Sequence, residues 1–440
     1  MKCIEDEIPF EVPNNWAWAR LRNICMMAAG KAKPANQIKA TPFEGGYPCF
    51  GGNGIRGYVD EYNQEGTFSI VGRQGALCGN INIASGKFYA TEHAVVTTLF
   101  AGIDFNWSNY ILEALNLNKY STGAAQPGLS VANVLNVFVP VPPTQEQERI
   151  GQKISKSIKT INIIEQEKQN LQTIIANTKS KILDLAIRGQ LIPQNPDDEP
   201  ASVLLERIRA EKEELIKQGK IKRDKKESII FKGEDNSYYE KLGEDVRCID
   251  EEIPYDIPDS WEWVRLKNCC IKEIRRGKSP KYTAKSNTLV FAQKCNTKYN
   301  GIDIGLALYL DESTLGRYPN EEYMHDSDVV VNSTGTGTLG RIGFYRTTDN
   351  IPGLPIVPDS HVTVIRGFRS IRAFYLYIFM KANQSVLEKK GEGSTNQKEL
   401  KPITLKEMLV PMPPAAEQQR IENAIITAFS FVEMIEKSLN

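Results

Sequence analysis

Two glycine-rich turns carry polar side chains that are suited to molecular recognition. Val71-Gly72-Arg73-Gln74-Gly75 follows one β-rich run, and residues 331–337, with the sequence VNSTGTG, follow another. An arginine can pair bidentately with guanine, and asparagine or glutamine with adenine, while serine, threonine and backbone N–H groups suit phosphate. A second polar loop lies further along the chain in each case, at residues 121–126 and 393–398. Any one loop could be a plain turn, but the occurrence of both loops twice favours recognition.

The candidate DNA-contacting residues are polar side chains of these loops together with basic side chains on neighbouring turns. They are Arg56, Arg73, Gln74, Thr122, Gln126, Lys278, Asn332, Ser333, Thr334, Thr336, Thr338, Arg341, Ser394, Thr395, Asn396 and Gln397.

Three glycine motifs could in principle hold a cofactor, but their surroundings do not fit. Residues 52–57 and 335–340 both match GxGxxG, and residues 50–54 match the FxGxG of methyltransferases. Such a loop needs a strand before it and a helix after it, whereas the residues that follow these motifs show no helical period. The Pro-Pro pairs at 142–143 and 413–414 are followed by Thr and Ala, so the Asp/Asn-Pro-Pro-aromatic loop of an amine methyltransferase is absent.

Metal and nucleophile chemistry is equally weakly supported. The three histidines, His93, His325 and His361, are too few and too separated for a confident metal site, and structural hydrogen bonding is favoured for them. The acidic run at residues 197–199 precedes a helix, where it suits the helix dipole. Eight cysteines without a CxxC pair indicate reduced thiols. We therefore expect no catalytic residue, cofactor or metal in this chain.

Composition is that of a globular protein with balanced charge. The 440 residues carry 54 basic and 54 acidic side chains, so a simple polycationic DNA-coating protein is disfavoured. If the chain binds DNA, its basic groups must cluster on one face, or a partner must supply much of the phosphate contact. The sequence has no long apolar run and starts without an apolar secretory core, so we expect a cytoplasmic protein without membrane spans.

The strongest internal signal is a duplication. Residues 3–25 (CIEDEIPFEVPNNWAWARLRNIC) and 248–270 (CIDEEIPYDIPDSWEWVRLKNCC) share both tryptophans and an arginine, and residues 137–154 and 408–425 share a Pro-x-Pro-Pro step followed by Glu-Gln and Arg-Ile. The interiors between these repeated ends share little beyond composition. A shared frame around divergent interiors predicts one fold that carries two different recognition surfaces.

Helical spacing predicts what joins the two copies. Pro142 and Pro143 end a strand, and Thr144 with Gln147 forms a capping box for a helix that ends near Gly189. About 43 residues would make a rod of roughly 65 Å. Its coiled-coil seam would be Ile150, Ile154, Ser157, Ile161, Ile164, Lys168, Leu171, Ile175, Thr178, Ile182 and Leu185.

The rest of the chain divides around this helix. A second amphipathic helix is expected from near Pro200 to Gly219, residues 220–247 are expected to be a surface linker, and a shorter helix follows Pro414. The expected domains are therefore 1–143, 144–247, 248–414 and 415–440.

Strands and helices alternate within the two modules. Strands are expected at Phe68–Val71, Val95–Phe100, Asp328–Val331 and His361–Ile365, and helices near Trp107–Asn116 and Ile371–Ala382. The fold class is therefore α+β, with two mixed α/β modules joined by long antiparallel coiled-coil helices.

Several stretches resemble the specificity subunit of type I restriction–modification enzymes. They are Ala186–Gln194 (AIRGQLIPQ), residues 197–208, the module entries at Ile8–Trp18 and Ile253–Trp263, and Asn332–Arg341 together with Asp359–Val362. The resemblance covers essentially the whole chain. It implies a non-catalytic subunit in which two target-recognition domains each read one half of a split double-stranded DNA site.

The resemblance also implies partners. The long helices would set the gap between the half-sites and dock two methylation subunits, which would bind S-adenosylmethionine and methylate adenine. A motor–nuclease subunit would add cleavage driven by ATP and dependent on Mg. Two alternatives remain open: a self-sufficient DNA methyltransferase that uses residues 50–54, and a coiled-coil scaffold whose modules bind protein or sugar.

Overall fold

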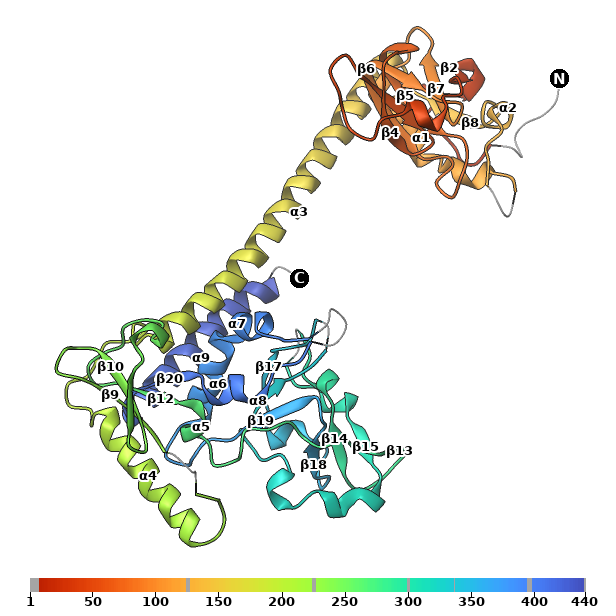
Figure 1. Cartoon of the computed structure of the whole chain (residues 1–440). Helices are drawn as coiled ribbons and strands as arrows, with labels where there is room; N and C mark the ends of the chain where they lie inside the picture. The colour runs from red at the N-terminus through yellow and green to blue at the C-terminus, as the bar shows by residue number, and fades with distance from the viewer. Residues whose placement is uncertain are drawn as a thin grey trace. The chain divides into compact units, whose positions relative to one another are not determined.

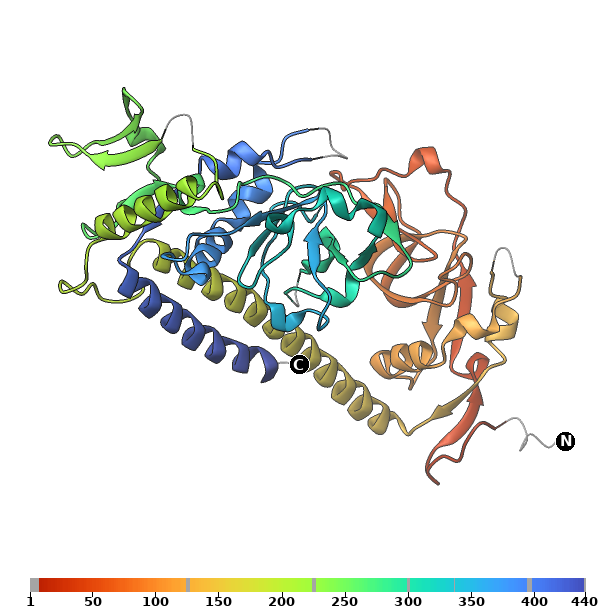
Figure 2. The same cartoon turned by 90° about the horizontal axis from the view of Figure 1, so that it is seen from below.

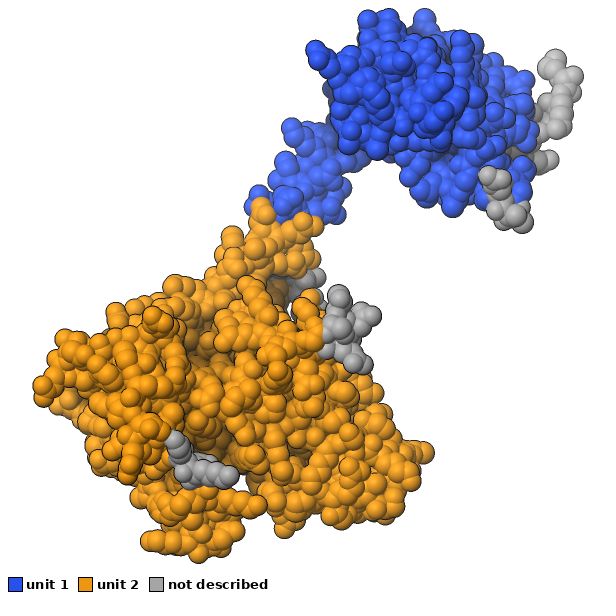
Figure 3. Space-filling model, in the orientation of Figure 1, with its two compact units in different colours: residues 1–167 blue, residues 168–440 orange. Residues whose placement is uncertain are grey.

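The computed structural model describes residues 8–123, 127–223, 227–298, 301–335, 337–393 and 398–438. The chain forms two compact units, unit 1 (residues 1–167) and unit 2 (residues 168–440), which Figure 3 shows in different colours. Helix α3 (Thr144–Ile187) begins in the first range and ends in the second. In the described residues, no helix combines the length and the apolar character needed to cross a membrane.

Unit 1 is built on a six-stranded sheet in the order β2-β7-β5-β6-β3-β4. The strands are β2 (Cys25–Ala29), β3 (Tyr47–Gly51), β4 (Gly54–Val59), β5 (Gln64–Gly72), β6 (Ile81–Ala90) and β7 (Ala94–Leu99). A two-stranded ladder joins β1 (Ala17–Arg20) to β8 (Phe138–Val141), and the helices are α1 (Phe105–Ala114) and α2 (Val131–Val134). Asp104 caps α1 by accepting a hydrogen bond from the Trp107 backbone N–H. The buried Trp107 side chain fixes this helix in the core beside the sheet.

The described residues of unit 2 form four separate small sheets, in the orders β11-β10-β9, β12-β20, β13-β15-β14-β18 and β17-β16-β19. The strands are β9 (Ser228–Lys232), β10 (Tyr238–Leu242), β11 (Asp245–Cys248), β12 (Glu262–Arg265), β13 (Tyr282–Thr283), β14 (Leu289–Phe291), β15 (Leu308–Leu310), β16 (Val329–Asn332), β17 (Ile342–Phe344), β18 (Ile356–Pro358), β19 (Val362–Ile365) and β20 (Leu409–Met412). The helices are α4 (Ala201–Lys217), α5 (Leu266–Cys269), α6 (Ala373–Ala382), α7 (Gln384–Lys389), α8 (Pro402–Lys406) and α9 (Ala415–Ser438). The buried side chains of α4 and of the end of α3 share one core with α6 and β16, so these helices pack against the second module.

The duplicated sequence frame forms the same structure in both units. Trp18 pairs with Pro140 in the β1–β8 ladder, and Trp263 pairs with Pro411 in the β12–β20 ladder. The two helix-start glutamines also repeat their contacts. Gln147 donates to the Pro142 carbonyl oxygen at 2.9 Å and accepts from the Asp104 backbone N–H, as Gln418 does with Pro413 (3.1 Å) and Arg372. The predicted duplication is therefore confirmed at the level of the ladder pairing and of the helix-start glutamine contacts.

The predicted long helix is confirmed as one continuous element of 44 residues. Within unit 2, its C-terminal part lies alongside α9 in both views (Figures 1 and 2). The pairing is antiparallel, because Lys179 of α3 forms a 2.7 Å salt bridge with Glu436 near the end of α9, whereas Asp198, which follows the C-terminal end of α3 in the chain, pairs with Arg420 near the start of α9. The seam is only partly buried: Ile175 is 7% exposed, whereas Ile161 and Ile164 are 53% and 61% exposed.

The expectation of a surface linker at residues 220–247 was wrong for most of this segment. Strands β9, β10 and β11 form an antiparallel sheet that packs Ile230 against Trp263. Glu240 of β10 is 1% exposed and hydrogen bonds to the buried Arg265 guanidinium at 3.0 and 2.8 Å. The high charge of this segment suggested that it is solvated. However, one of its carboxylates, that of Glu240, is buried as the ion-pair partner of Arg265, the arginine of the duplicated frame.

Candidate nucleic-acid interface

In unit 1 the two predicted polar loops meet. We call residues 73–80 together with 121–123 and 127–129 the first loop pair. The Leu129 backbone N–H donates to the Arg73 carbonyl oxygen at 2.8 Å, and the Gly75 N–H donates to Pro127 at 2.9 Å. On its other side, the Arg73 N–H donates to the His93 carbonyl oxygen at 2.9 Å. Backbone hydrogen bonds therefore hold the loops together, whatever side chains they carry.

Unit 2 repeats this arrangement. We call residues 333–335 and 337–341 together with 391–393 and 398–400 the second loop pair. The Leu400 N–H donates to the Ser333 carbonyl oxygen at 2.8 Å, and the Ser333 N–H donates to His361 at 2.8 Å. These contacts match those of Leu129, Arg73 and His93 one for one. Ser333 thus occupies the position of Arg73, although the surrounding sequences share little similarity.

A glycine closes the first turn of each loop pair. The Gly79 N–H donates to Gly72 at 2.7 Å, and the Gly340 N–H donates to Asn332 at 2.8 Å. Both glycines have positive φ, of +84° and +75°, and an added Cβ would lie 2.4 Å from Asn118 N and 2.6 Å from Glu388 N, respectively. Only glycine fits such a position, because it needs both the left-handed backbone conformation and the close approach.

The first loop pair presents side chains that are available for a ligand. Gln74 and Thr122 are exposed and Arg73 is half-buried. Within the described residues, no side-chain hydrogen bond or ion pair engages Arg73 or Gln74. Arg56 is exposed on β4, two residues beyond the hairpin turn whose Asn53 accepts a 2.7 Å hydrogen bond from Asn80. Four predicted residues therefore lie on or next to one surface.

The second loop pair holds most of its predicted residues in internal contacts. Asn332 and Ser333 are fully buried; Asn332 donates to Gln293 at 3.1 Å, and Ser333 shares a 2.7 Å hydrogen bond with Thr363. The Arg341 guanidinium stabilises the loop by donating hydrogen bonds to the carbonyl oxygens of Asn296 (2.8 Å) and Gly337 (3.0 Å). Burial therefore contradicts the expectation that Asn332 and Ser333 are presented to a ligand.

Threonine side chains remain at the surface of this loop pair. The Thr334 hydroxyl lies 2.6 Å from Nδ1 of the exposed His361, and Thr338 donates to the Thr334 carbonyl oxygen at 3.2 Å.

Lys278 is not brought to the second loop pair by its contacts. Its ammonium group donates to the Arg317 carbonyl oxygen and lies 3.8 Å from a carboxylate oxygen of Glu322.

Six of the predicted contact residues lie outside the described residues. They are Gln126, Thr336, Ser394, Thr395, Asn396 and Gln397.

Sequence reasoning missed four residues at these sites. His93 and His361 were given a structural role, but each lies beside a loop pair at the equivalent position. Arg276 reaches Glu399 at 3.1 Å, and Gln293 lies 3.5 Å from the Thr334 hydroxyl. Of these four residues, only the histidines had a signal in the sequence. Each histidine follows a polar or acidic residue (Glu92-His93 and Ser360-His361) and lies beside a β-rich run at the same place in its module.

A buried carboxylate positions His361. Asp359 is 2% exposed and accepts a 2.8 Å hydrogen bond from the His361 backbone N–H. Burial raises the pKa of the Asp359 carboxyl above its usual range, and the hydrogen bond and the nearby histidine oppose that rise.

The glycine motifs do not form cofactor loops. Residues 52–57 lie in the hairpin between β3 and β4, and residues 335–340 lie between β16 and β17, so no helix follows either motif. This arrangement argues against the self-sufficient methyltransferase, because the ligand would have no helix N-terminus to bind. The described residues also hold no group of three or more His, Cys, Asp or Glu side chains that could bind a metal ion.

Comparison with known proteins identifies the family. Residues 13–173 and 258–440 match the type I restriction modification DNA specificity domain. These two ranges make up most of the chain, so the chain belongs to this family. The predicted resemblance to the type I restriction–modification specificity family is thereby confirmed.

Two relatives and one solved structure illustrate the similarity. The chain is 40% identical over 166 residues to the type I restriction enzyme EcoprrI specificity subunit of Escherichia coli, covering 38% of this chain and 41% of that protein. It is 29% identical over 272 residues to the EcoAI specificity subunit of Escherichia coli, covering 60% of this chain and 41% of that protein. The matches thus span less than half of each relative's length.

The solved structure comes from work on complex assembly and conformational transition of the type I R-M system. It superposes with a TM-score of 0.57 at 15% identity and covers 98% of this chain and 94% of that one. The expected α+β fold, with two sheet-containing modules and long helices, is confirmed by this likeness.

Proposed function

We propose that this chain reads a bipartite double-stranded DNA site, with the first loop pair contacting one half and the second loop pair contacting the other. The observation that carries the proposal is that one backbone arrangement is built twice and holds different side chains. Arg73 and Gln74 can each form two hydrogen bonds with a base edge in the major groove. In the second loop pair, Thr334, Thr338 and His361 are the described side chains that can contact bases or phosphates.

The remaining predicted residues take supporting roles in this proposal. Arg56 and Thr122 flank Arg73 and suit phosphate contacts, and Lys278 supplies positive charge at a distance from the loops. Asn332, Ser333 and Arg341 position the second loop pair from within. The candidates that lie outside the described residues stay candidates for base contacts: Gln126, Thr336, Ser394, Thr395, Asn396 and Gln397.

Partner subunits would complete the activity. Exposed apolar side chains on α3 (Ile161, Ile163, Ile164) and on α9 (Phe431, Met434) suit a helix-binding partner. We assign these faces to two methylation subunits, which would carry S-adenosylmethionine and methylate adenine. A motor–nuclease subunit would use ATP and Mg for cleavage, and the assembly would act in the cytoplasm. The chain's zero net charge supports this division, because partners would then supply much of the phosphate contact.

A module exchange tests the proposal. Residues 26–136 are replaced by the matching residues of a homologue with a known site, and methylated positions are mapped in cells that also contain the methylation subunit. We expect one half of the methylated site to change, because the frame and the second module are untouched. Exchange of residues 271–407 is the matched control and should change only the other half. A change in both halves after a single exchange would contradict the two-reader arrangement.

A further inference from the structure

A third turn lies beside each loop pair, at residues 52–54 in unit 1 and at residues 293–295 in unit 2. Each third turn begins two residues after a phenylalanine, Phe50 of β3 or Phe291 of β14. Both phenylalanines belong to parallel strand pairs, β3 with β6 and β14 with β18. Their carbonyl oxygens accept a backbone hydrogen bond from the residue that follows β6 or β18, at 3.0 and 3.1 Å. The two third turns are therefore equivalent, residue by residue, at their start.

Gln293 takes in unit 2 the position that Gly52 takes in unit 1. The backbone carbonyl oxygen at this position contacts the start of the loop pair in both units. An added Cβ at Gly72 would lie 2.0 Å from the Gly52 carbonyl oxygen, and the Asn332 side-chain amide donates to the Gln293 carbonyl oxygen at 3.1 Å. The third turn is thus joined to the loop pair in the same way twice, but only unit 2 carries a side chain there.

The Gln293 carboxamide lies against the second loop pair. Its Oε1 lies 3.5 Å from the Thr334 hydroxyl, and an added Cβ at Gly335 would lie 2.9 Å from Oε1 and 3.1 Å from Nε2. Thr334 occupies in this loop pair the position that Gln74 occupies in the first. A glutamine from the neighbouring turn is therefore placed beside the position at which the first loop pair carries a glutamine of its own.

Buried groups hold the backbone of Gln293, whereas its side chain remains available. Asn332 and Asp359, both buried, contact its carbonyl oxygen and its N–H. Burial raises the pKa of the Asp359 carboxyl, and the backbone N–H groups of His361 and Gln293 oppose this rise. Gln293 is half-buried, and within the described residues its amide nitrogen donates no hydrogen bond. Its 3.5 Å contact with Thr334 is at the limit of hydrogen-bonding distance, so the carboxamide can bind a ligand.

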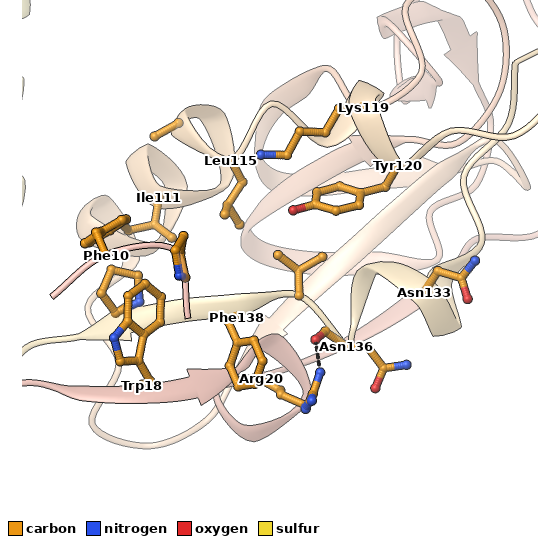
Figure 4. A pocket seen from close by; sticks show the side chains of 14 residues that line it. Phe10, Trp18, Arg20, Ile111, Leu115, Lys119, Tyr120, Asn133, Asn136 and Phe138 are labelled. Atoms are coloured by element: carbon orange, nitrogen blue, oxygen red, sulfur yellow. Dashed lines mark hydrogen bonds between the residues drawn. The ribbon is translucent and has the colours of Figure 1, made fainter. Parts of the chain in front are cut away.

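The candidate readers of unit 1 also lie on turns and not in the pocket of that unit. Figure 4 shows this pocket, which has a volume of about 570 Å³ and is lined by Trp18 and Phe138 of the frame ladder. Neither Arg73 nor Gln74 lines it. Carboxamides on turns between strands are therefore what the two modules share. Such turns suit the major groove of DNA, which is wide enough to admit a two-stranded β-ribbon.

We propose that Gln293 reads an adenine in the half-site that unit 2 contacts. This inference rests on the proposed function and names a residue that determines its specificity. A carboxamide carries a hydrogen-bond acceptor and a donor side by side, so it pairs bidentately with the N6 amino group and N7 of adenine. Thr334 contacts both Gln293 and His361, at 3.5 and 2.6 Å, so side chains from three segments form one connected surface for the bases.

Substitution of Gln293 tests the assignment in the assembled methylation complex. The half-site that unit 2 reads is first identified by exchange of residues 271–407 and mapping of methylated positions. Competition binding with single-base variants of this half-site then measures discrimination. Gln293→Ala should reduce discrimination at one A·T pair, other than the methylated pair, by roughly fivefold to 150-fold. Gln293→Glu should shift the preference at that pair toward C·G, because a carboxylate accepts a hydrogen bond from the N4 amino group of cytosine.

Lys294→Ala is the matched control, because it removes an exposed side chain from the next position of the same turn. It should leave the base preference of both half-sites unchanged. The half-site that unit 1 reads should be unchanged in every variant. Thermal unfolding of each variant shows whether the fold is retained.

Three outcomes would overturn the assignment of Gln293. The first is a wild-type base preference in the second half-site for both Gln293 variants. The second is an equal loss of binding to every single-base variant, which would make Gln293 a phosphate contact. The third is loss of recognition of both half-sites together with a lower unfolding temperature, which would make its role structural. Absence of bipartite methylation by the wild-type complex would instead overturn the proposed function, and the assignment of Gln293 with it.

Discussion

The two loop pairs have one backbone arrangement but differ in what they present. In the first, Arg73 and Gln74 extend from the turn without side-chain partners among the described residues; in the second, Ser333 is buried and Thr334 contacts His361. The contacts that hold the turns are made by backbone atoms in both cases. Side chains at these positions can therefore change without loss of the turn, which is what a family of sequence readers needs.

The frames beneath the loop pairs differ in burial, and the largest expected effect follows from this. Arg265→Ala should destabilise unit 2 by about 3–5 kcal/mol, because it removes the buried guanidinium from the buried Glu240 carboxylate, which then keeps only Ser228 and the more exposed Arg247 as partners. Arg20→Ala, at the equivalent but half-buried position, should cost about 1 kcal/mol in unit 1. Guanidinium unfolding followed by pulsed hydrogen exchange would report the two units separately. Equal losses in both units would show that the frames are energetically alike.

Acid should lower the stability of unit 2 more than that of unit 1. Burial raises the pKa of Glu240, but hydrogen bonds from Arg265, Ser228 and Arg247 outweigh burial and lower it to about 2. A folded-state pKa below the ordinary 4.5 gives stability that is complete above about pH 4.5 and is lost as the pH falls toward 2, amounting to about 3 kcal/mol at most.

The free energy of unfolding of each unit would be measured between pH 6 and pH 3 by the same combination of guanidinium unfolding and pulsed hydrogen exchange. Glu240→Gln should flatten the acid-dependent part of the unit 2 profile. A steeper loss in unit 1 than in unit 2 would argue against the assigned role of Glu240.

The third expected effect is on base preference, because the two loop pairs expose different side chains. Arg73→Ala should relax discrimination at one base pair of one half-site by about 1–3 kcal/mol, roughly fivefold to 150-fold in relative binding, if the arginine pairs with guanine. Ser333→Ala at the equivalent position should leave base preference unchanged, because its hydroxyl is buried against Thr363. Competition binding with single-base variants of the site, in the assembled methylation complex, would measure both. A preference change with Ser333→Ala alone would reverse the assignment.

Much of the fold could be predicted, because its signals are local. Prolines located the start of α3, and a glycine located its end, so the predicted bounds agree with Thr144–Ile187. The predicted capping box was wrong, because the Thr144 hydroxyl donates to the Gly102 carbonyl oxygen, and the Gln147 amide donates to Pro142 and accepts from the Asp104 N–H. The repeated tryptophans and Glu-Gln pairs predicted two equivalent frames, which the Trp18 and Trp263 ladders confirm. The segment at residues 220–247 failed because its charge suggested solvation, whereas burial of Glu240 depends on Arg265, which lies 25 positions away in the sequence.

The candidate site was predicted in outline only. Composition and spacing located the polar turns around Arg73 and Asn332, but a side chain's exposure depends on neighbours that are distant in sequence. Asn332 is buried by Gln293 and Asn296, and His361 joins the second loop pair through the Ser333 backbone.

By itself, the sequence determined the duplicated frame, the long helix and the existence of two polar loops per module, because proline, glycine, capping and apolar periodicity act over a few residues. The tertiary structure alone decided that the loops of each module meet, which side chains they present and which face of each frame is covered. These outcomes depend on hydrogen bonds and packing between segments tens of residues apart, and residue order along the chain does not encode those distances.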